Sequence, residues 1–400
     1  MSNAQLAYAG DEAAVRGLAA DALHPQSPAL VAALAALDAY PQPNEATALI
    51  VAKCRALAVG YDARYGHEAY YTPVAVEQMY LSPIVNPDTN AKSRTFQVGG
   101  KLDLLYQRNG HLGVFDHKTT SQDILDPDGT FWRQLTIEGQ VSHYMLLMWL
   151  CGQKCDEAVW DVMRKPTISP KKITKAERTA AVANREYFDR PLSPATLQAL
   201  QAEERETLEM YEARLVHDCV KERPQYYFQR RVVPRLDAEL IEYARELWGH
   251  GQEILHARKT NRHARNSGAC MLYGTPCKFL GICSGHDTPD SDKWARKAQV
   301  HAELELDGDG RDVITNSRIR CFQTCRRKHY YDFEMGIVRH DEEDREALLF
   351  GTIWHLALEA WWSTFLPKEP INGNRCESPA TEVGNRPAIG NPAEADGCYF

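Results

Sequence analysis

The most constraining feature of this 400-residue chain is a pair of strand-like runs that are joined by only two residues. The runs cover 96–108 and 111–119, and Asn109-Gly110 stands between them. This dipeptide favours a type I′ turn, because both central residues of that turn need a positive φ and Asn and Gly accept it readily. The sequence therefore predicts a tight antiparallel hairpin whose short loop determines which residues face each other.

The predicted register pairs acidic residues inside the hairpin. With Arg108 opposite His111, each step outward along the strands leads to Asp103 opposite Asp116. Opposed like charges destabilise a sheet unless something neutralises them, and a divalent cation would do so. Lys118 lies on the same face, where its ammonium would orient a water or stabilise a phosphate in its transition state. The alternative interpretation is an ordinary Lys–Asp ion pair at a solvent-exposed strand end.

Strand and helix patterns alternate along the chain and indicate an α/β or α+β core. Apolar spacing predicts helices in 28–65, 133–150, 171–188, 193–216 and 237–257. Strand-like composition predicts further strands at 74–85, 157–163 and 225–233. A new structured unit is expected to begin at 313 and to run to 362. The residues 367–400 have few large apolar groups and are expected to be disordered.

The composition limits the classes of protein to consider. The net charge of −8 argues against non-specific coating of nucleic acid, although it allows a local basic groove beside an acidic metal site. The chain has no long apolar run and no signal-like start, which predicts neither membrane insertion nor secretion and favours a cytoplasmic location. In a reducing compartment, the 11 cysteines are expected to be thiols or metal ligands.

Three cysteines cluster in an irregular stretch. Cys270, Cys277 and Cys283 have the spacing C-x6-C-x5-C, which indicates a metal or iron–sulfur site that needs a fourth ligand. Zinc is expected if His263 or His286 completes a tetrahedron, although the C-x2-C pairs typical of zinc sites are missing here. The remaining alternative is that these are scattered buried cysteines.

Two further groups of residues gain meaning next to the hairpin. Gln140 and Tyr144 stand four residues apart and so share one side of a predicted helix. The segment 164–178 holds six basic residues and one acidic residue, which would contact phosphates or form a solvated helix face. The basic residues proposed for DNA contact are Arg164, Lys165, Lys171 and Lys172.

Together these motifs resemble the RecB-like family of PD-(D/E)xK nucleases, including phage-type exonucleases and AddB-type enzymes. The resemblance covers about 70–285 and rests on Gly100-Lys101-Leu102-Asp103, 114–120, Gln140-x3-Tyr144, Arg164-Lys165-Pro166 and the three cysteines. It implies a restriction-endonuclease-like α/β fold, a mixed β-sheet core flanked by helices with an iron–sulfur loop. It also implies that Asp103 and Asp116 bind Mg²⁺ or Mn²⁺, that Lys118 helps to activate water, and that four cysteines hold a [4Fe–4S] cluster.

The family's opening motifs occur here at the wrong end of the chain. The segment 315–331, with Cys325, resembles the opening helix of the family with its first cluster cysteine. The segment 350–355 resembles the next helix, with His355 as the histidine of the metal site. We therefore expect a permuted order in which 313–365 folds back and supplies Cys325 and His355. The alternative is the start of a second, truncated copy or a rearranged reading frame, with Cys54 as another possible fourth cluster ligand.

The resulting hypothesis is a metal-dependent DNA exonuclease of phage or bacterial recombination or repair. Asp103, Asp116 and His355, with the backbone carbonyl of His117, would hold the ion, and Gln140 and Tyr144 would orient the scissile strand. The expected domains are a poorly structured start (1–24), a nuclease core (25–285), a linker (286–311), a helical segment (312–366) and a disordered tail (367–400). A helicase or recombinase partner would supply any unwinding, because the sequence contains no P-loop motif.

Two rival functions remain open from the sequence. The first is a non-catalytic iron–sulfur subunit that binds DNA ends within a recombination complex. The second is a zinc protein of unrelated chemistry.

Overall fold

The computed structural model describes residues 27–67, 70–202, 204–298, 300–301, 310–340 and 346–367. The expected start, 1–24, and all but the first residue of the expected tail, 367–400, lie outside these ranges. None of the described helices is both long and apolar enough to cross a membrane.

The centre of the molecule is a mixed sheet with the strand order β1-β2-β3-β4-β7. Its strands are β1 (Thr72–Val85), β2 (Lys92–Arg108), β3 (His111–Thr120), β4 (Glu157–Arg164) and β7 (Phe228–Val233), and β9 (Asp312–Ile314) also pairs with β2. The β3–β4 and β2–β9 pairs are parallel, and the other pairs are antiparallel. This mixed sheet with flanking helices confirms the predicted fold class.

The hairpin of β2 and β3 has the predicted turn and register. Arg108 pairs with His111, and the pairing continues inward to Leu104 opposite Phe115. Asn109 and Gly110 both have a positive φ, 52° and 85°, as a type I′ turn requires.

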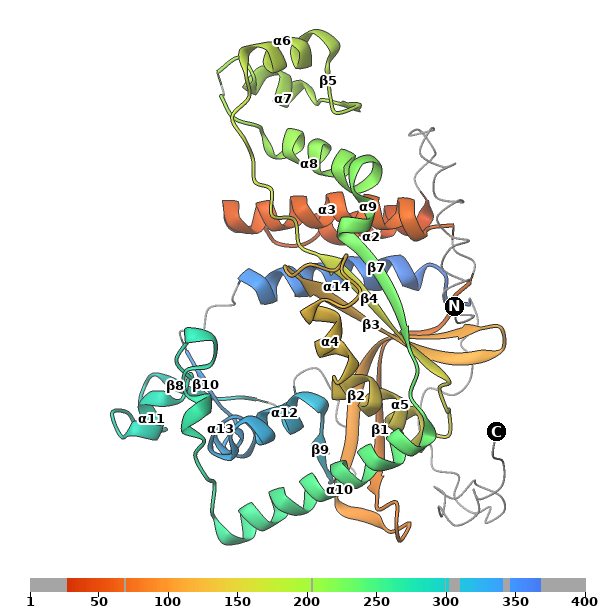
Figure 1. Ribbon diagram of the computed structural model, residues 1–400. Helices are drawn as coiled ribbons and strands as arrows, with labels where there is room; N and C mark the ends of the chain where they lie inside the picture. Colours follow the sequence, from red (N-terminus) through yellow and green to blue (C-terminus); the bar gives the residue numbers. More distant parts are fainter. Residues whose placement is uncertain are drawn as a thin grey trace.

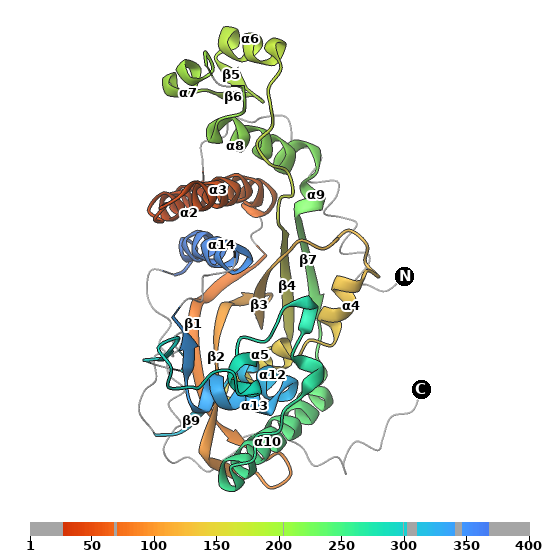
Figure 2. The ribbon, with the colours of Figure 1, turned by 90° about the vertical axis from the view of Figure 1, so that its left-hand side faces the viewer.

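Helices cover both faces of the sheet (Figures 1 and 2). One face is covered by α2 (Pro28–Asp38), α3 (Glu45–Tyr65) and α14 (Glu346–Ser363), which pack against one another. The other face is covered by α5 (Gly139–Leu150), α10 (Asp237–Thr260) and α12 (Asn316–Thr324). Each layer forms its own apolar core with the sheet. The last described helix therefore lies beside the first two, although more than 280 residues separate them.

An outer lobe projects beyond the helical layer, at the top of Figure 1. It contains α6 (Lys175–Asn184), β5 (Glu186–Tyr187), β6 (Arg190–Pro191), α7 (Pro194–Ala199) and α8 (Leu208–His217), which share a small core. The single helix predicted for 193–216 is wrong, because Ser193 and Thr207 each cap the start of a separate helix. The helix predicted for 171–188 is shorter than expected, because Thr174 and Glu177 form a capping box at its start.

Two further boundaries differ from the sequence prediction. The helix predicted for 133–150 is divided into α4 (Thr130–Thr136) and α5, and the Arg235 side chain donates to the carbonyl of Thr136 at the break. The strand predicted for 225–233 begins as the short helix α9 (Pro224–Tyr227), with Pro224 in the first turn, where a missing N–H costs nothing.

The cysteine-rich segments form a module beside the sheet, which we call the cysteine module (266–298 with 316–339). Besides α12, its elements are η2 (Ser267–Ala269), η3 (Leu272–Gly274), α11 (Leu280–Ser284), β8 (Trp294–Arg296), α13 (Arg326–His329), η4 (Tyr330–Glu334) and β10 (Ile337–Arg339). Outside this module, the short helix η1 (Asp218–Glu222) follows α8. Arg318 is 1% exposed and bonds Asp312 of β9 at 2.7 Å and Glu334 at 2.8 Å. This buried ion cluster fastens the module to the sheet.

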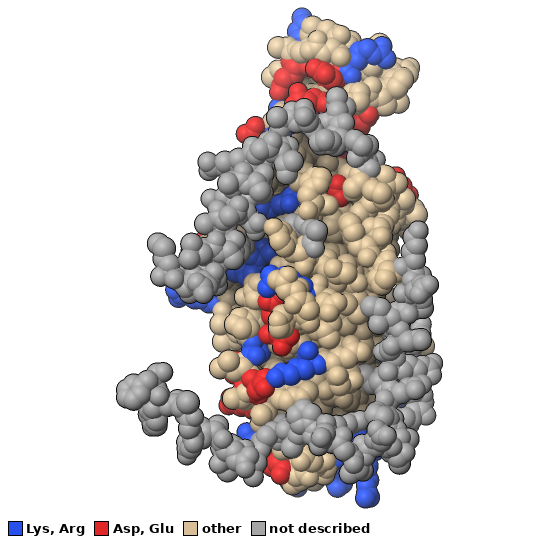
Figure 3. Space-filling model, turned by 90° about the vertical axis from the view of Figure 1, so that its right-hand side faces the viewer, with Lys and Arg blue, Asp and Glu red and all other residues tan. Residues whose placement is uncertain are grey.

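Charged residues are unevenly spread over the side opposite the cysteine module. In Figure 3, Lys and Arg side chains gather toward the left margin of this face, a column of mixed red and blue side chains lies beside them, and the area to the right of that column is largely tan.

Candidate functional site

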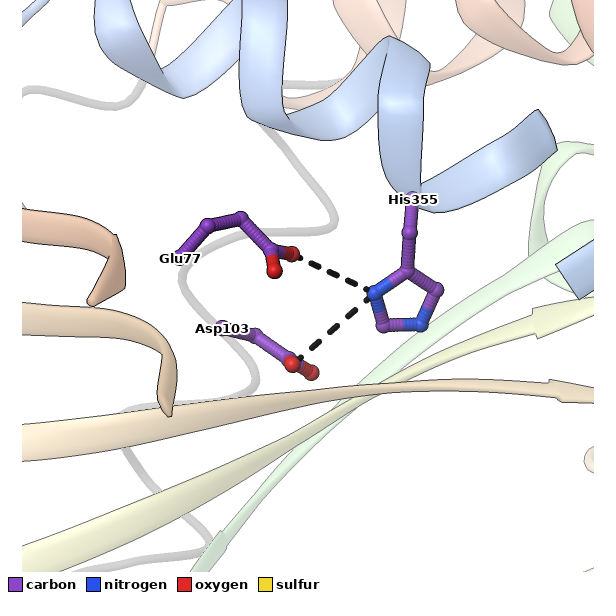
Figure 4. Close-up of side chains that lie close together, drawn as sticks. All are labelled: Glu77, Asp103 and His355. Atoms are coloured by element: carbon purple, nitrogen blue, oxygen red, sulfur yellow. Dashed lines mark hydrogen bonds and ion pairs between the residues drawn. The ribbon is translucent and has the colours of Figure 1, made fainter. Parts of the chain in front are cut away.

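A group of potential metal ligands lies where the sheet meets α14. Atoms of Glu77, Asp103 and His355 all lie within 4.8 Å of one another. Nδ1 of His355 is 3.4 Å from Oε1 of Glu77 and 3.8 Å from Oδ1 of Asp103, and the three side chains converge in Figure 4. Segments that are far apart in the chain thus contribute to one site.

The packing of α14 positions its histidine. The neighbouring residues Ile353, Trp354, Ala357 and Leu358 are buried in the core that α14 shares with the sheet. Because these residues set the rotation of the helix, His355 projects toward the carboxylates at the rim of this core. Asp103 is held from the other side, since its Oδ2 accepts a hydrogen bond of 2.7 Å from the backbone N–H of His117.

A second chain of contacts runs along the neighbouring face of β3. Lys118 forms an ion pair with Asp116, and its Nζ donates to Oε1 of Gln140 at 2.9 Å. Nε2 of Gln140 donates to the hydroxyl of Tyr144 at 2.9 Å. The structure therefore brings all four residues into one connected group, with the two residues on α5 reaching toward the two on β3.

Burial and neighbouring charges perturb the ionisable groups. Burial raises the pKa of Asp116 to about 6, with Lys118 opposing the rise and Asp103 adding to it. Burial would lower the pKa of His355, but the bond to Glu77 and the charge of Asp103 raise it to about 9. The residues of this site therefore interact electrostatically across β2, β3 and α14.

These donors fit a hard divalent cation. Carboxylate oxygens are the ligands that Mg²⁺ and Mn²⁺ prefer. Oδ2 of the buried Asp116 pairs with Lys118, whereas Oδ1 has no hydrogen-bond partner within the described part of the chain and so has coordination capacity left for a cation. The imidazole of His355 would add a nitrogen ligand once a bound cation displaces its proton.

A buried polar network supports the strand behind this site. Nδ1 of His117 lies 2.8 Å from Asp161, whose other oxygen accepts from Nε of Arg230 at 2.8 Å. Tyr61 of α3 donates to Asp161 at 2.7 Å, and the guanidinium of Arg230 lies 3.5 Å from the ring centre of Tyr65. Because the backbone of His117 also holds Asp103, this network links the core to the carboxylates.

Four cysteines line a single cavity in the cysteine module: Cys270, Cys277, Cys283 and Cys325. Cys321 lies one helical turn before the fourth of these and does not line the cavity. Cys54, the other potential fourth ligand, is buried in the core around α2, α3 and α14, and burial raises the pKa of its thiol. Four thiols around one cavity fit the cysteine ligation of a [4Fe–4S] cluster.

The two histidines considered for zinc lie outside this cavity lining. The ring of His263 stacks on Tyr330 at a centroid distance of 4.1 Å. Nδ1 of His286 lies 2.9 Å from the hydroxyl of Ser284.

The predicted DNA-contacting residues lie at the end of β4 and in the adjoining lobe. Arg164 bonds Asp123 at 3.0 Å, and Lys165 lies 5.1 Å from the ring centre of Phe350 on α14. Lys171 bonds Glu177 at 2.7 Å, whereas Lys172 forms an isolated β-bridge with Arg205 at the base of the lobe. These contacts are made with residues other than Asp103, Asp116 and His355.

Glu77 was not anticipated from the sequence. It lies in the strand-like run 74–85, but the connection between β1 and β2 spans residues 86–91 and does not determine their register. Only the observed pairing of Val76 with Leu104 and Gln78 with Leu102 places Glu77 across from Asp103.

Comparison with known proteins gives one match. The family model of the PD-(D/E)XK nuclease superfamily matches residues 12–283 and 313–387. No curated protein and no solved structure shows a significant match to this chain.

Proposed function

This chain belongs to the PD-(D/E)XK nuclease superfamily, and on that premise we propose that it is a RecB-like, Mg²⁺- or Mn²⁺-dependent DNA exonuclease that acts in recombination or repair. The carrying observation is the convergence of His355 on Asp103, beside Asp116 and Lys118. The restriction-endonuclease-like fold of the superfamily accounts for the mixed sheet that presents these residues.

Each residue of the site has a separate proposed role in phosphodiester hydrolysis. Asp103, Asp116 and His355 would hold the ion, with the backbone carbonyl of His117 as a further ligand. A divalent ion, when bound, would lower the pKa of a water and neutralise charge on the phosphate. Lys118 would orient the attacking water and stabilise the charge that develops on the phosphate oxygens.

Gln140 and Tyr144 support this arrangement from α5. The carbonyl of Gln140 holds the ammonium of Lys118, and its amide is bonded to Tyr144. We propose that Gln140 orients Lys118 and the scissile strand, and that Tyr144, whose ring is buried in the core, holds the amide of Gln140 through its hydroxyl. Arg164, Lys165, Lys171 and Lys172 remain predictions for contacts with the DNA backbone.

The permuted motif order is part of this proposal. The segment that carries Cys325 and His355 follows the hairpin in sequence, yet β9 pairs with β2 and α14 packs on α2 and α3. These contacts are expected if the segment completes the same domain. The start of a second, truncated copy would not be expected to pair with β2 or to pack on α2 and α3.

The test of this function is a cleavage assay on two forms of DNA. Anaerobically purified full-length protein should degrade end-labelled linear DNA when Mg²⁺ or Mn²⁺ is present and should spare a closed circle of the same sequence. A Lys118→Met preparation, purified in parallel, controls for contaminating nucleases. Cleavage of the circle would make the protein an endonuclease. DNA binding without metal-dependent cleavage would instead favour the non-catalytic end-binding subunit.

We also propose that Cys270, Cys277, Cys283 and Cys325 hold a [4Fe–4S] cluster that fastens the cysteine module. Anaerobically purified wild-type protein is then expected to contain about four iron atoms per chain, and Cys325→Ser is expected to lose most of them. Cys321→Ser is the matched control, because that thiol is one helical turn away and does not line the cavity. Zinc in place of iron, or full iron content in Cys325→Ser, would contradict the assignment.

A further inference from the structure

We infer that Glu77 is an additional protein ligand of the metal centre, supplied by β1. This inference rests on the proposed nuclease function and extends it to a residue that lies outside the sequence motifs of the hairpin.

The position of Glu77 makes it a cross-strand neighbour of Asp103. The flanking residues Val76 and Gln78 pair with Leu104 and Leu102, so Glu77 and Asp103 stand at the same level of the β1–β2 ladder. On the third strand, Asp116 directly follows Phe115, the partner of Leu104, and so lies next to this level of the sheet. Three adjacent strands therefore each present a carboxylate in one row, an arrangement that destabilises a sheet unless positive charge is near.

The orientation of the Glu77 carboxylate is determined from both sides. Its Oε2 lies 2.7 Å from Nζ of Lys101, and its Oε1 faces Nδ1 of His355 at 3.4 Å. The lysine thus occupies the outer oxygen and leaves the inner oxygen directed toward Asp103 and His355, as Figure 4 shows for these three residues. An oxygen held in this direction is available to an ion bound between the three side chains.

Glu77 is more than a counterion for the lysine. Its side chain is only 12% exposed, whereas that of Lys101 is 39% exposed. An ion pair of this kind is worth little at a surface, and moving the carboxylate inward adds a desolvation cost. Glu77 also has a φ of 49°, which is unfavourable for a residue with a side chain. A role at the carboxylate row explains why the strand turns this side chain inward.

The experiment measures Mn²⁺ binding to the full-length protein by electron paramagnetic resonance, independently of cleavage. Glu77→Gln, which keeps the size of the side chain, is expected to raise the Kd for Mn²⁺ about tenfold or more. Glu359→Gln is the matched control, because this exposed carboxylate of α14 also interacts with Lys101 but is not part of the group with Asp103 and His355. Its Kd is expected to stay within about twofold of the wild-type value. Thermal unfolding of each variant verifies that it is folded.

The Asp103→Asn variant separates failure of this inference from failure of the proposed function. If Asp103→Asn loses Mn²⁺ and Glu77→Gln binds it as the wild type does, Glu77 is not a ligand and the metal centre stands. If neither variant changes Mn²⁺ binding, the proposed metal centre itself is wrong. Should Glu77→Gln fail to fold, Glu77→Asp tests the same inference, because its shorter carboxylate should also weaken binding while keeping the charge.

Discussion

Replacing Lys118 with methionine is expected to lower the rate of DNA cleavage by a factor of about 10³, in the range seen when one preorganised donor is removed from a transition state. The Lys118 side chain is only 27% exposed, and its ammonium is held by Asp116 and by Gln140. A methionine side chain of similar length fills the space but donates no hydrogen bond. The measurement is the initial rate on end-labelled linear DNA at saturating Mg²⁺ or Mn²⁺.

Metal binding distinguishes the role of Lys118 from that of the carboxylates. Removing a positive charge beside the metal centre should not weaken the binding of a cation. The Kd of Lys118→Met for Mn²⁺ is therefore expected to be equal to or lower than the wild-type value. Lys118→Arg keeps the charge but changes the shape of the donor, and it should recover only part of the rate. A Lys118→Met variant that cleaves DNA at close to the wild-type rate would eliminate this residue from the mechanism.

Replacing Arg230 with methionine is expected to reduce the free energy of unfolding by about 3–5 kcal/mol, the usual cost of breaking a buried ion pair. The guanidinium is the strongest of the favourable influences on Asp161, and it helps to hold the pKa of that carboxyl well below the ordinary range against the opposing effect of burial. Without Arg230, this carboxylate stays buried, and its remaining hydrogen-bond partners among the described residues are His117 and Tyr61. Urea-induced unfolding followed by tryptophan fluorescence measures the change.

An exposed ion pair serves as the control for this prediction. Arg245 bonds Asp88 at 2.9 Å, but both side chains are largely exposed, and Arg245→Met is expected to cost less than about 1 kcal/mol. If Arg230→Met costs no more than this control, the network of Asp161 is not a stabilising part of the core. Because the network also reaches His117, a destabilised Arg230→Met is further expected to bind Mn²⁺ more weakly.

Turn preference and residue spacing along the sequence were sufficient to predict the parts of the site that lie on one short hairpin. The turn at Asn109-Gly110 left one register for β2 and β3, so the neighbourhood of Asp103, Asp116 and Lys118 followed from counting residues. The same rules wrongly predicted one helix for 193–216, because the spacing of apolar residues does not reveal that two separate capping residues divide the segment into two helices. They also failed at 133–150, where a distant arginine bonds the last carbonyl of α4.

The sequence by itself determined the hairpin, the alternation of helices and strands, and the grouping of residues that are close along the chain. Only the tertiary structure decided that β1 places Glu77 opposite Asp103. The motif resemblance predicted that 313–365 returns with Cys325 and His355 but left a truncated second copy as the alternative, and the structure shows α14 packed on the first helices and Cys325 lining one cavity with the other three cysteines. The physical reason is that a two-residue turn leaves the chain almost no freedom. Long connections leave many possible registers and docking positions, and only the burial of complementary apolar faces selects one of them.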